Sequence, residues 1–274
     1  MMVKTQAIAL KIRPWSHTSH VVTWLTPDHG RTLTSVKGAC RPKSAFLGQY
    51  DIGYTCELLF YARDRGGLHA IRECTPANIR EPLRVDWRAG VAASYFCDLV
   101  AAVSVPMQEA QALFDLLNRS LDNLCDRMPG TGHLLAFEIA LLDRLGILPD
   151  LSLCPICHTP ERTWIRFSLA SGRALCAHAS AVAVLEPAVT LHRDVVTSLR
   201  DHLSPESALH LPHSGALALG IRRFLGLFIR YHLDLPPAAR RVAFDLLDEP
   251  STERKPNPND PVAKGADHEM RHAC

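Results

Sequence analysis

Two cysteine-containing segments carry residue types that bind a metal. Cys154 and Cys157 lie three positions apart in the stretch LCPICHTP, and Cys176 follows after a gap of 18 residues. A Cys-x-x-Cys pair forms half of a zinc knuckle, and the gap falls within the interval of about 15 to 20 residues that zinc ribbons use. We therefore expect a structural zinc ion held by four ligands in a tetrahedron.

The fourth ligand of this expected site departs from a regular repeat. A second Cys-x-x-Cys pair would place a cysteine at position 179, where the chain has alanine. We prefer His178 as the fourth ligand, because an imidazole nitrogen suits zinc, and keep His158 as the alternative. The competing interpretation is that this loop has kept its fold without a metal.

A second metal motif lies near the end of the chain. His268 and His272 enclose Glu269 in the pattern H-E-x-x-H, which on a helix holds zinc with the glutamate as general base. This motif follows the polar, proline-rich stretch after Asp248, which we expect to be disordered, so we interpret it as a chance match. The sequence contains no P-loop, no dinucleotide-binding glycine motif and no nucleophile elbow, and we expect no catalytic site.

A basic segment near the N-terminus suits a phosphate backbone. The interval between Asp28 and Asp51 contains no acidic residue and four cations, namely Arg31, Lys37, Arg41 and Lys43. A local positive field of this kind attracts nucleic acid without reading its base sequence. The alternative is an ordinary solvated loop.

The composition describes a globular protein with an uneven charge distribution. The chain has 274 residues, of which 47% are hydrophobic, and a net charge of only +2. Its first 80 residues hold eleven Lys and Arg against five Asp and Glu, so the positive charge is concentrated there. Nine cysteines and no apparent signal peptide argue against a disulfide framework. With no apolar run of about 18 residues, we expect a cytoplasmic protein without a membrane segment.

The elements that position these residues follow from hydrophobic periodicity. Five short runs in residues 1–80 alternate apolar and polar side chains, which is typical of strands, and Ile8, Leu10 and Ile12 share one side of the first run. Asp28 to Gly30 predicts a hairpin turn. Five short strands are too few for a sandwich and indicate a small closed barrel of the SH3-like or OB-like type.

From Pro82 the spacing of apolar residues changes to three and four, which predicts amphipathic helices. We expect a helical domain in two parts, residues 81–149 and 183–248, interrupted by the cysteine-containing insertion at residues 150–182. The later helical stretches are residues 187–203 and 214–235, the second with a stripe formed by Leu217, Ile221, Phe224, Leu225 and Phe228. The expected tail is residues 249–274.

Three stretches together resemble the RecO family of bacterial DNA repair proteins. LTPDHGRTLTSVKGACRPKSAFLGQYDIGYTCELLFYAR is similar to the N-terminal domain of that family, in which a hairpin glycine leads to a KGARR.KS segment. FEIALLDRLGILPDLSLCPIC resembles the helix that runs into the zinc region, and IRRFLGLFIRYHLDLPPAARR resembles the last helices. The resemblance extends in order from residue 3 to about residue 248.

This resemblance implies an α+β multidomain protein with an N-terminal OB-fold β-barrel and a helical bundle domain that carries an inserted zinc-finger-like knuckle. It implies a mediator and not an enzyme, which binds single- and double-stranded DNA and anneals complementary strands on the nucleoid. It also implies two protein partners, RecR and the C-terminal tail of single-strand binding protein, and a role in loading the recombinase RecA.

On this interpretation Lys37, Arg41 and Lys43 follow the phosphates, with Arg31 on the neighbouring strand, and Trp24, Phe46 or Tyr50 could stack on bases, although Trp24 fits a core position better. The sequence departs from the family at Cys40, where a denser arginine run is typical. It also lacks the fourth cysteine of the knuckle, which leaves open whether zinc is bound. Two other hypotheses remain: a zinc-ribbon factor without annealing activity, and a zinc hydrolase that uses His268 and His272.

Overall fold

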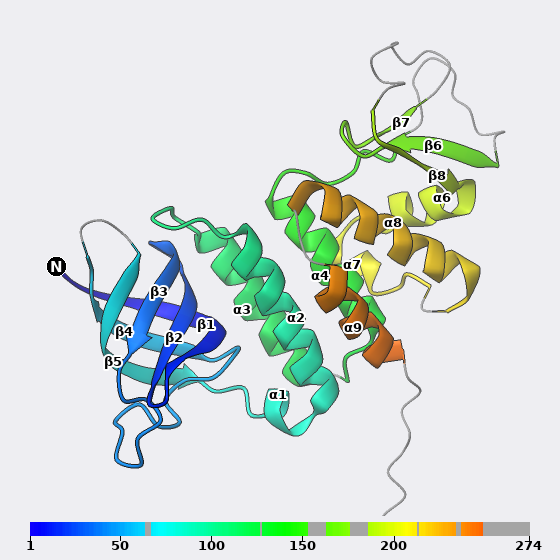
Figure 1. The fold of residues 1–274 in the computed structure, drawn as a ribbon. Helices are drawn as coiled ribbons and strands as arrows, with labels where there is room; N and C mark the ends of the chain where they lie inside the picture. The colour runs from blue at the N-terminus through cyan, green and yellow to red at the C-terminus, as the bar shows by residue number, and fades with distance from the viewer. Residues whose placement is uncertain are drawn as a thin grey trace, which may run out of the picture.

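The computed structural model describes residues 1–63, 67–126, 128–152, 163–175, 186–212, 214–233 and 237–248. A five-stranded barrel lies at one end, a set of helices forms the middle, and a small sheet lies at the other end (Figure 1). The four expected zinc ligands and the H-E-x-x-H motif lie outside the described residues. Within the described ranges no helix is both long and apolar enough to cross a bilayer.

The barrel confirms the expected N-terminal fold. Its strands close in the order β1-β2-β3-β5-β4, and the pairing of β3 with β5 is parallel while every other pair is antiparallel. This five-stranded, Greek-key arrangement is that of an OB-like barrel. The strands are β1 (Met2–Ser16), β2 (Ser19–Thr26), β3 (Gly30–Val36), β4 (Thr55–Tyr61) and β5 (Leu68–Asn78).

The first strand differs from its expected alternation because it is buried on both faces. Ile8 and Leu10 pack with the helices, as one face of a strand should. A register shift between Ala9 and Lys11 then exchanges the two faces of the strand. Ile12 therefore packs with the barrel core around Trp24. The prediction that Ile12 shares a side with Ile8 and Leu10 was therefore wrong, because a β-bulge reverses the alternation of side chains.

The turn after β2 attaches the barrel to the helical domain. Gly30 has a φ of 60°, and a Cβ at this position would lie 2.2 Å from the carbonyl oxygen of Val105, so only glycine fits. The backbone N–H of Arg31 donates to that same oxygen at 3.1 Å, and the N–H of Met107 donates to the carbonyl of His29 at 2.9 Å. The predicted hairpin turn is thus confirmed and is also a domain contact.

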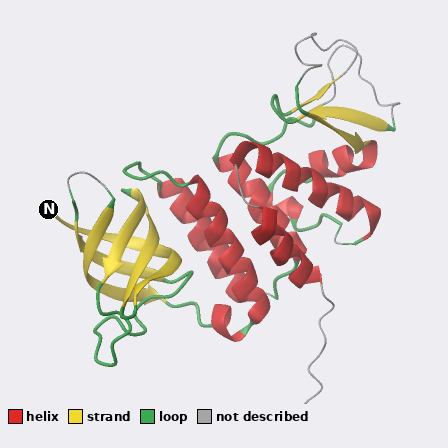
Figure 2. Cartoon of the chain, in the orientation of Figure 1, coloured by secondary structure: helices red, strands yellow, loops and turns green. Residues whose placement is uncertain are grey.

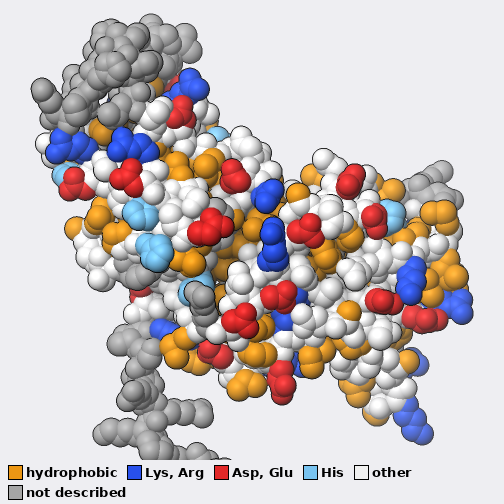
Figure 3. All heavy atoms as spheres, turned by 180° about the vertical axis from the view of Figure 1, so that it is seen from behind, with side chains coloured by type: hydrophobic (Ala, Val, Ile, Leu, Met, Phe, Trp, Pro, Cys, Tyr) orange, Lys and Arg blue, Asp and Glu red, His pale blue; other side chains and the backbone are white. Residues whose placement is uncertain are grey.

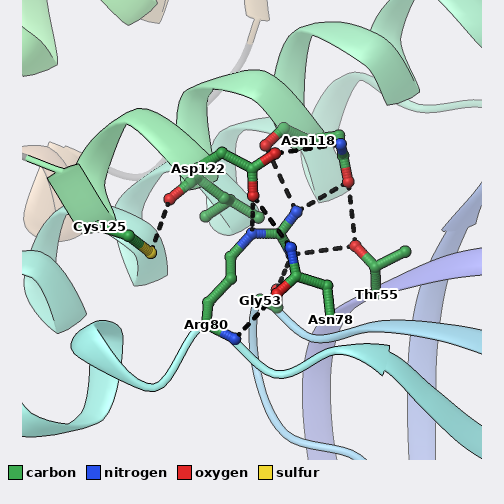
Figure 4. A network of polar contacts seen from close by, with 8 residues as sticks. Gly53, Thr55, Asn78, Arg80, Asn118, Asp122 and Cys125 are labelled. Atoms are coloured by element: carbon green, nitrogen blue, oxygen red, sulfur yellow. Dashed lines mark hydrogen bonds and ion pairs between the residues drawn. The ribbon is translucent and has the colours of Figure 1, made fainter.

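Arg80 forms a second link between the barrel and the helices. This side chain is buried, and its guanidinium donates to the Gly53 carbonyl at 2.7 Å and to the Thr55 hydroxyl at 2.9 Å on the barrel side. On the helical side it donates to Asn118 Oδ1 at 2.8 Å and to Asp122 Oδ1 at 2.7 Å (Figure 4). One residue at the domain boundary therefore joins the two domains through paired, hydrogen-bonded charge.

Helices form in the stretches where the apolar spacing predicts them, and Figure 2 shows them grouped between the barrel and the small sheet. Phe96 and Phe137 stack with ring centroids 3.9 Å apart. The predicted apolar stripe in the helix Gly215–Leu233 is buried from Ile221 to Phe228, and Leu217 is half-buried. The helices are α1 (Pro82–Val85), α2 (Trp87–Val103), α3 (Gln111–Asp126), α4 (Thr131–Arg144), α6 (Arg193–Asp201), α7 (Pro205–Ala208), α8 (Gly215–Leu233) and α9 (Pro237–Asp248).

A buried ion pair joins α4 to α9 inside this domain. Glu138 is completely buried, and Arg240 binds both of its carboxylate oxygens, Nε to Oε1 at 2.7 Å and Nη2 to Oε2 at 2.8 Å. The hydroxyl of Tyr95 on α2 donates to the same carboxylate at 2.5 Å. The guanidinium of Arg240 also lies 4.3 Å from the ring centroid of Phe244. Three helices are therefore held together around one carboxylate.

A three-stranded sheet covers one end of α8. Its order is β7-β6-β8, and Phe167 of β6 packs edge-on against Phe224 of α8 at 5.0 Å between centroids. The prediction of a helix from residue 187 was wrong for its first part, because Ala188–His192 pair with β6 as a strand and the helix begins at Arg193. The strands are β6 (Trp164–Ser168), β7 (Arg173–Leu175) and β8 (Ala188–His192).

Candidate nucleic-acid interface

The segment after β3 forms an exposed, positively charged loop. We define the cationic loop as residues 37–50, in which Lys37, Arg41 and Lys43 are all exposed. Gly38 has a φ of 70°, and the Arg41 side chain lies over it, with the Arg41 N–H donating to the Gly38 carbonyl at 3.1 Å. The structure therefore brings three of the four predicted phosphate-binding residues together.

No described acidic residue forms an ion pair with Lys37, Arg41 or Lys43. Figure 3 shows the molecule from behind, with lysine and arginine side chains projecting at the barrel end of this face. Because exposed charges without a protein partner stay available to a polyanion, this loop has the electrostatics that phosphate binding requires.

Arg31, the fourth predicted residue, lies elsewhere. It occupies the start of β3, whereas Lys37 follows the end of that strand, so the length of β3 separates them. Its side chain is half-buried, and Nη1 donates to the carbonyl of Ala101 at 3.1 Å, at the C-terminal end of α2. Its Nε is buried and has no hydrogen-bond partner among the described residues. Arg31 therefore belongs to the junction between the domains and not to the cationic loop.

The β1–β2 hairpin lies beside the cationic loop and adds residues that sequence reasoning missed. The N–H of Cys40 donates to the carbonyl of Thr18 at 3.2 Å, and the N–H of Gly38 donates to the hydroxyl of Ser19 at 3.3 Å. On this hairpin Trp15 is 69% exposed, an unusual degree for a tryptophan. Arg13, which is also exposed, stands two residues before it. The only sequence signal was an isolated aromatic residue between Pro14 and Ser16.

The aromatic residues singled out from sequence take different positions. Trp24 is fully buried, and its indole N–H donates to the hydroxyl of Thr34 at 2.8 Å, which confirms the core placement. Tyr50 is half-buried, and its hydroxyl oxygen lies in hydrogen-bond contact with Nδ1 of His20 at 2.8 Å. Phe46 is half-buried in the cationic loop and packs against the barrel core. Trp15 is therefore the aromatic side chain with the most accessible face next to the loop.

The segments that lead to the expected zinc ligands lie side by side. Asp150 and Arg173 form a parallel bridge, and the N–H of Asp150 donates to the carbonyl of Gly172 at 2.8 Å. A side-chain ion pair between them reinforces the bridge at 3.2 Å. The described parts of these two segments end at Ser152 and Leu175, shortly before Cys154 and Cys176 in the sequence. The ligands Cys154, Cys157, Cys176 and His178 themselves lie outside the described residues.

A groove of about 550 Å³ lies in the helical domain between α3, α4 and α7. Phe137 is among its lining residues, but it is only 2% exposed and stacks on Phe96, so it belongs mainly to the core. The exposed residues Arg119, Arg144, Asp143 and Glu206 also line the groove, so its charge is mixed. This volume lies within the range of ligand pockets, about 300–1,000 Å³.

Family comparison matches both parts of the chain. Residues 1–80 match the description "Recombination protein O N terminal", and residues 84–241 match "Recombination protein O C terminal". The boundary between the two matches falls at Arg80, where the barrel ends and the helices begin. The family division thus coincides with the structural one.

Several curated relatives carry the name DNA repair protein RecO. The protein of Alkaliphilus metalliredigens is 31% identical over 179 residues, which are 64% of this chain and 71% of the relative. That of Moorella thermoacetica is 30% identical over 177 residues, 64% and 65% of the two chains. That of Syntrophus aciditrophicus is 30% identical over 176 residues, 63% and 68%. The OB-like barrel, the helical domain and the two family matches together show that this chain belongs to the RecO family.

Proposed function

We propose that this protein is a DNA repair and recombination mediator that binds single- and double-stranded DNA and anneals complementary strands. The observation that carries the proposal is the group of three exposed cations, Lys37, Arg41 and Lys43, together with the exposed ring of Trp15 on the hairpin that contacts their loop. The family membership supports it, because relatives are named as DNA repair proteins. The protein acts by binding and not by turnover, in the cytoplasm and on the nucleoid.

The contacts are expected to be largely independent of base sequence. Lysine and arginine side chains that neutralise phosphates release counterions from the nucleic acid. The affinity for DNA therefore falls steeply as the salt concentration rises. An exposed indole offers a face on which an unpaired base can stack, worth about 1–3 kcal/mol per base. The combination favours a flexible single strand, and the cationic loop by itself also suits the backbone of a duplex.

Strand annealing follows from the same surface, because cations that screen two anionic strands lower the repulsion between them. We expect the purified protein to accelerate pairing of two complementary oligonucleotides, measured by fluorescence quenching, with an effect that disappears at high salt. Salt-sensitive DNA binding without any acceleration would favour the zinc-ribbon factor. Loss of function after removal of residues 250–274 would favour the hydrolase, whereas the mediator should retain annealing.

A structural zinc ion forms the second part of the proposal. The donor set Cys154, Cys157, Cys176 and His178 has the composition of a closed structural site, and the parallel bridge between Asp150 and Arg173 supports the meeting of its two halves. Zinc bound there would hold the insertion in one conformation. His158 remains the alternative fourth ligand.

We expect the purified protein to contain about one zinc per chain and the Cys154→Ser variant to lose most of it, because three ligands bind zinc more weakly than four. Metal content is measured by elemental analysis after gel filtration. Cys125→Ser, which alters a half-buried cysteine in α3, is the matched control. Equal metal content in native protein and the Cys154→Ser variant would exclude this site.

Two protein partners complete the proposal. We place RecR as the partner with which the protein loads the recombinase RecA, and the C-terminal tail of single-strand binding protein as the ligand of the helical groove. The half-buried Leu209 and the exposed cations Arg119 and Arg144, which all line the groove, support an acidic tail with apolar side chains. The acidic residues Asp143 and Glu206, which also line the groove, limit how such a tail can lie.

A further inference from the structure

The cationic loop contains a thiol that DNA binding does not use. Cys40 is exposed, whereas the other cysteines that the structure describes are buried or half-buried, namely Cys56, Cys74, Cys97 and Cys125. A thiol reacts only where a reagent can reach its sulfur. Cys40 also stands where the family pattern described above has arginine, so this feature belongs to this chain and not to the family motif.

Cys40 is the first member of a hydrogen-bonded chain of three side chains. Its Sγ lies 3.2 Å from Nε2 of His20, and Nδ1 of the same ring lies 2.8 Å from the hydroxyl oxygen of Tyr50. In the tautomer with its proton on Nδ1, His20 donates to the Tyr50 oxygen and keeps a lone pair on Nε2 that can accept the thiol proton. A nucleophile, a base and a residue that orients the base are therefore in contact.

This arrangement is built into the barrel. His20 lies on β2, in register with Val36 of β3, and the N–H of Cys40 is held by the carbonyl of Thr18 at 3.2 Å. The ring of Tyr50 packs edge-on against buried Trp24, with centroids 6.0 Å apart. Burial raises the pKa of the Tyr50 phenol, with smaller contributions from the Cys40 and Cys74 thiols, so the phenol stays neutral beside the base.

The surroundings of the thiol select an anionic reagent. Arg41 is adjacent to Cys40 in the chain, and Lys37 and Lys43 each lie three residues away. None of these three cations is paired with a described acidic residue. A cationic surface raises the local concentration of small anions as it does that of nucleic acid.

We propose that Cys40 is a base-activated thiol that undergoes exchange with an anionic low-molecular-weight disulfide such as oxidised glutathione. The sulfur of Cys40 attacks one sulfur of the disulfide while His20 takes the thiol proton. A new disulfide bond forms between Cys40 and that half of the reagent, the original disulfide bond breaks, and the departing thiolate takes the proton from His20 to leave as a thiol. His20 is the catalytic base, and Tyr50 is a positioning residue.

This modification has a consequence that rests on the proposed function. The adduct places carboxylates and bulk between the cations that contact DNA phosphates, so it should weaken DNA binding until a reducing thiol removes it. The exchange is reversible because an exposed mixed disulfide is open to attack by another thiolate. The loop would thereby report the redox state of the cell to the repair machinery.

The chemistry is tested on the reduced, full-length protein with oxidised glutathione as the reagent. The rate at which Cys40 is modified is followed by mass spectrometry of the proteolytic peptide that contains it, so reaction at other cysteines does not interfere. We expect His20→Gln to slow this rate about ten-fold and Tyr50→Phe, which keeps the ring that packs on Trp24, to slow it about three-fold. Native rates in both variants, with unchanged thermal unfolding, would overturn the proposal.

The consequence for DNA is tested separately. The adduct of the native protein should bind single-stranded DNA about five-fold or more weakly than the reduced protein, and a reducing thiol should restore the affinity. Cys40→Ser treated in the same way is the control and should keep its affinity. A modified protein with full affinity would overturn the regulatory role. Failure of the reduced protein to bind DNA would instead count against the proposed function, while the rate measurements would still test the thiol chemistry.

Discussion

Replacing Lys37, Arg41 and Lys43 together by glutamate is expected to lower the affinity for single-stranded DNA about 100-fold at moderate salt. Each of the three side chains is exposed and unpaired with any described acid, so each is free to release counterions from a phosphate. Losing three phosphate contacts should reduce the slope of log affinity against log salt by about two on a single strand. Fluorescence anisotropy over a salt series measures both quantities.

The matched control reverses three other exposed cations. Lys4, Arg72 and Arg200 lie in exposed ion pairs with Glu57, Glu73 and Asp201, respectively, so their replacement by glutamate changes the net charge by the same amount. Exposed pairs contribute about 0–1 kcal/mol each, and this variant should still fold. We expect its affinity for DNA to change only a few-fold. Equal losses in the two variants would mean that net charge, and not the cationic loop, governs binding.

The second large effect concerns stability. The Arg240→Met variant should lose about 3–5 kcal/mol of unfolding free energy, because Glu138 is fully buried and would keep only the Tyr95 hydroxyl as a described side-chain partner. Chemical denaturation measures this loss. Arg200→Met applies the same substitution to an exposed ion pair with Asp201 and should cost less than about 1 kcal/mol.

A compensated variant separates the buried charge from lost packing. Glu138→Leu combined with Tyr95→Phe and Arg240→Met removes the carboxylate together with both of its partners. We expect this triple variant to recover most of the stability, to within about 1–2 kcal/mol of the native protein, since a well-packed apolar set can replace a buried ion pair. A triple variant that is less stable than Arg240→Met would show that the pair itself stabilises the three helices.

The fold was predictable for strands and helices that bury a single face, because their apolar residues then recur at a regular spacing. Alternation located all five barrel strands, and the spacing of Ile221, Phe224 and Phe228 located α8. The prediction failed where the physics is not local. In β1, a bulge before Ile12 changes the face to which this side chain points. In Ala188–His192, five residues are too few for their periodicity to distinguish a strand from the start of a helix. Pairing with β6 decides the second case.

The candidate interface was predictable as a charge pattern but not as a surface. The interval without acidic residues between Asp28 and Asp51 singled out Lys37, Arg41 and Lys43, and the structure places these three residues in one exposed loop. Arg31 shares that pattern, yet the length of β3 places it at the domain junction. Trp15 joins the loop only through the pairing of the β1–β2 hairpin with the cationic loop. Tertiary contacts of this kind leave no local signal in the sequence.

Ultraviolet cross-linking of the intact protein to a halogenated single-stranded oligonucleotide tests the central claim most directly. Peptide mapping by mass spectrometry then identifies the residues that touch DNA. We expect cross-links at Trp15 and within residues 37–43, and we expect their yield to fall as salt is raised. Cross-links confined to the helical domain from Trp87 onward, with none in the hairpin or the cationic loop, would contradict it.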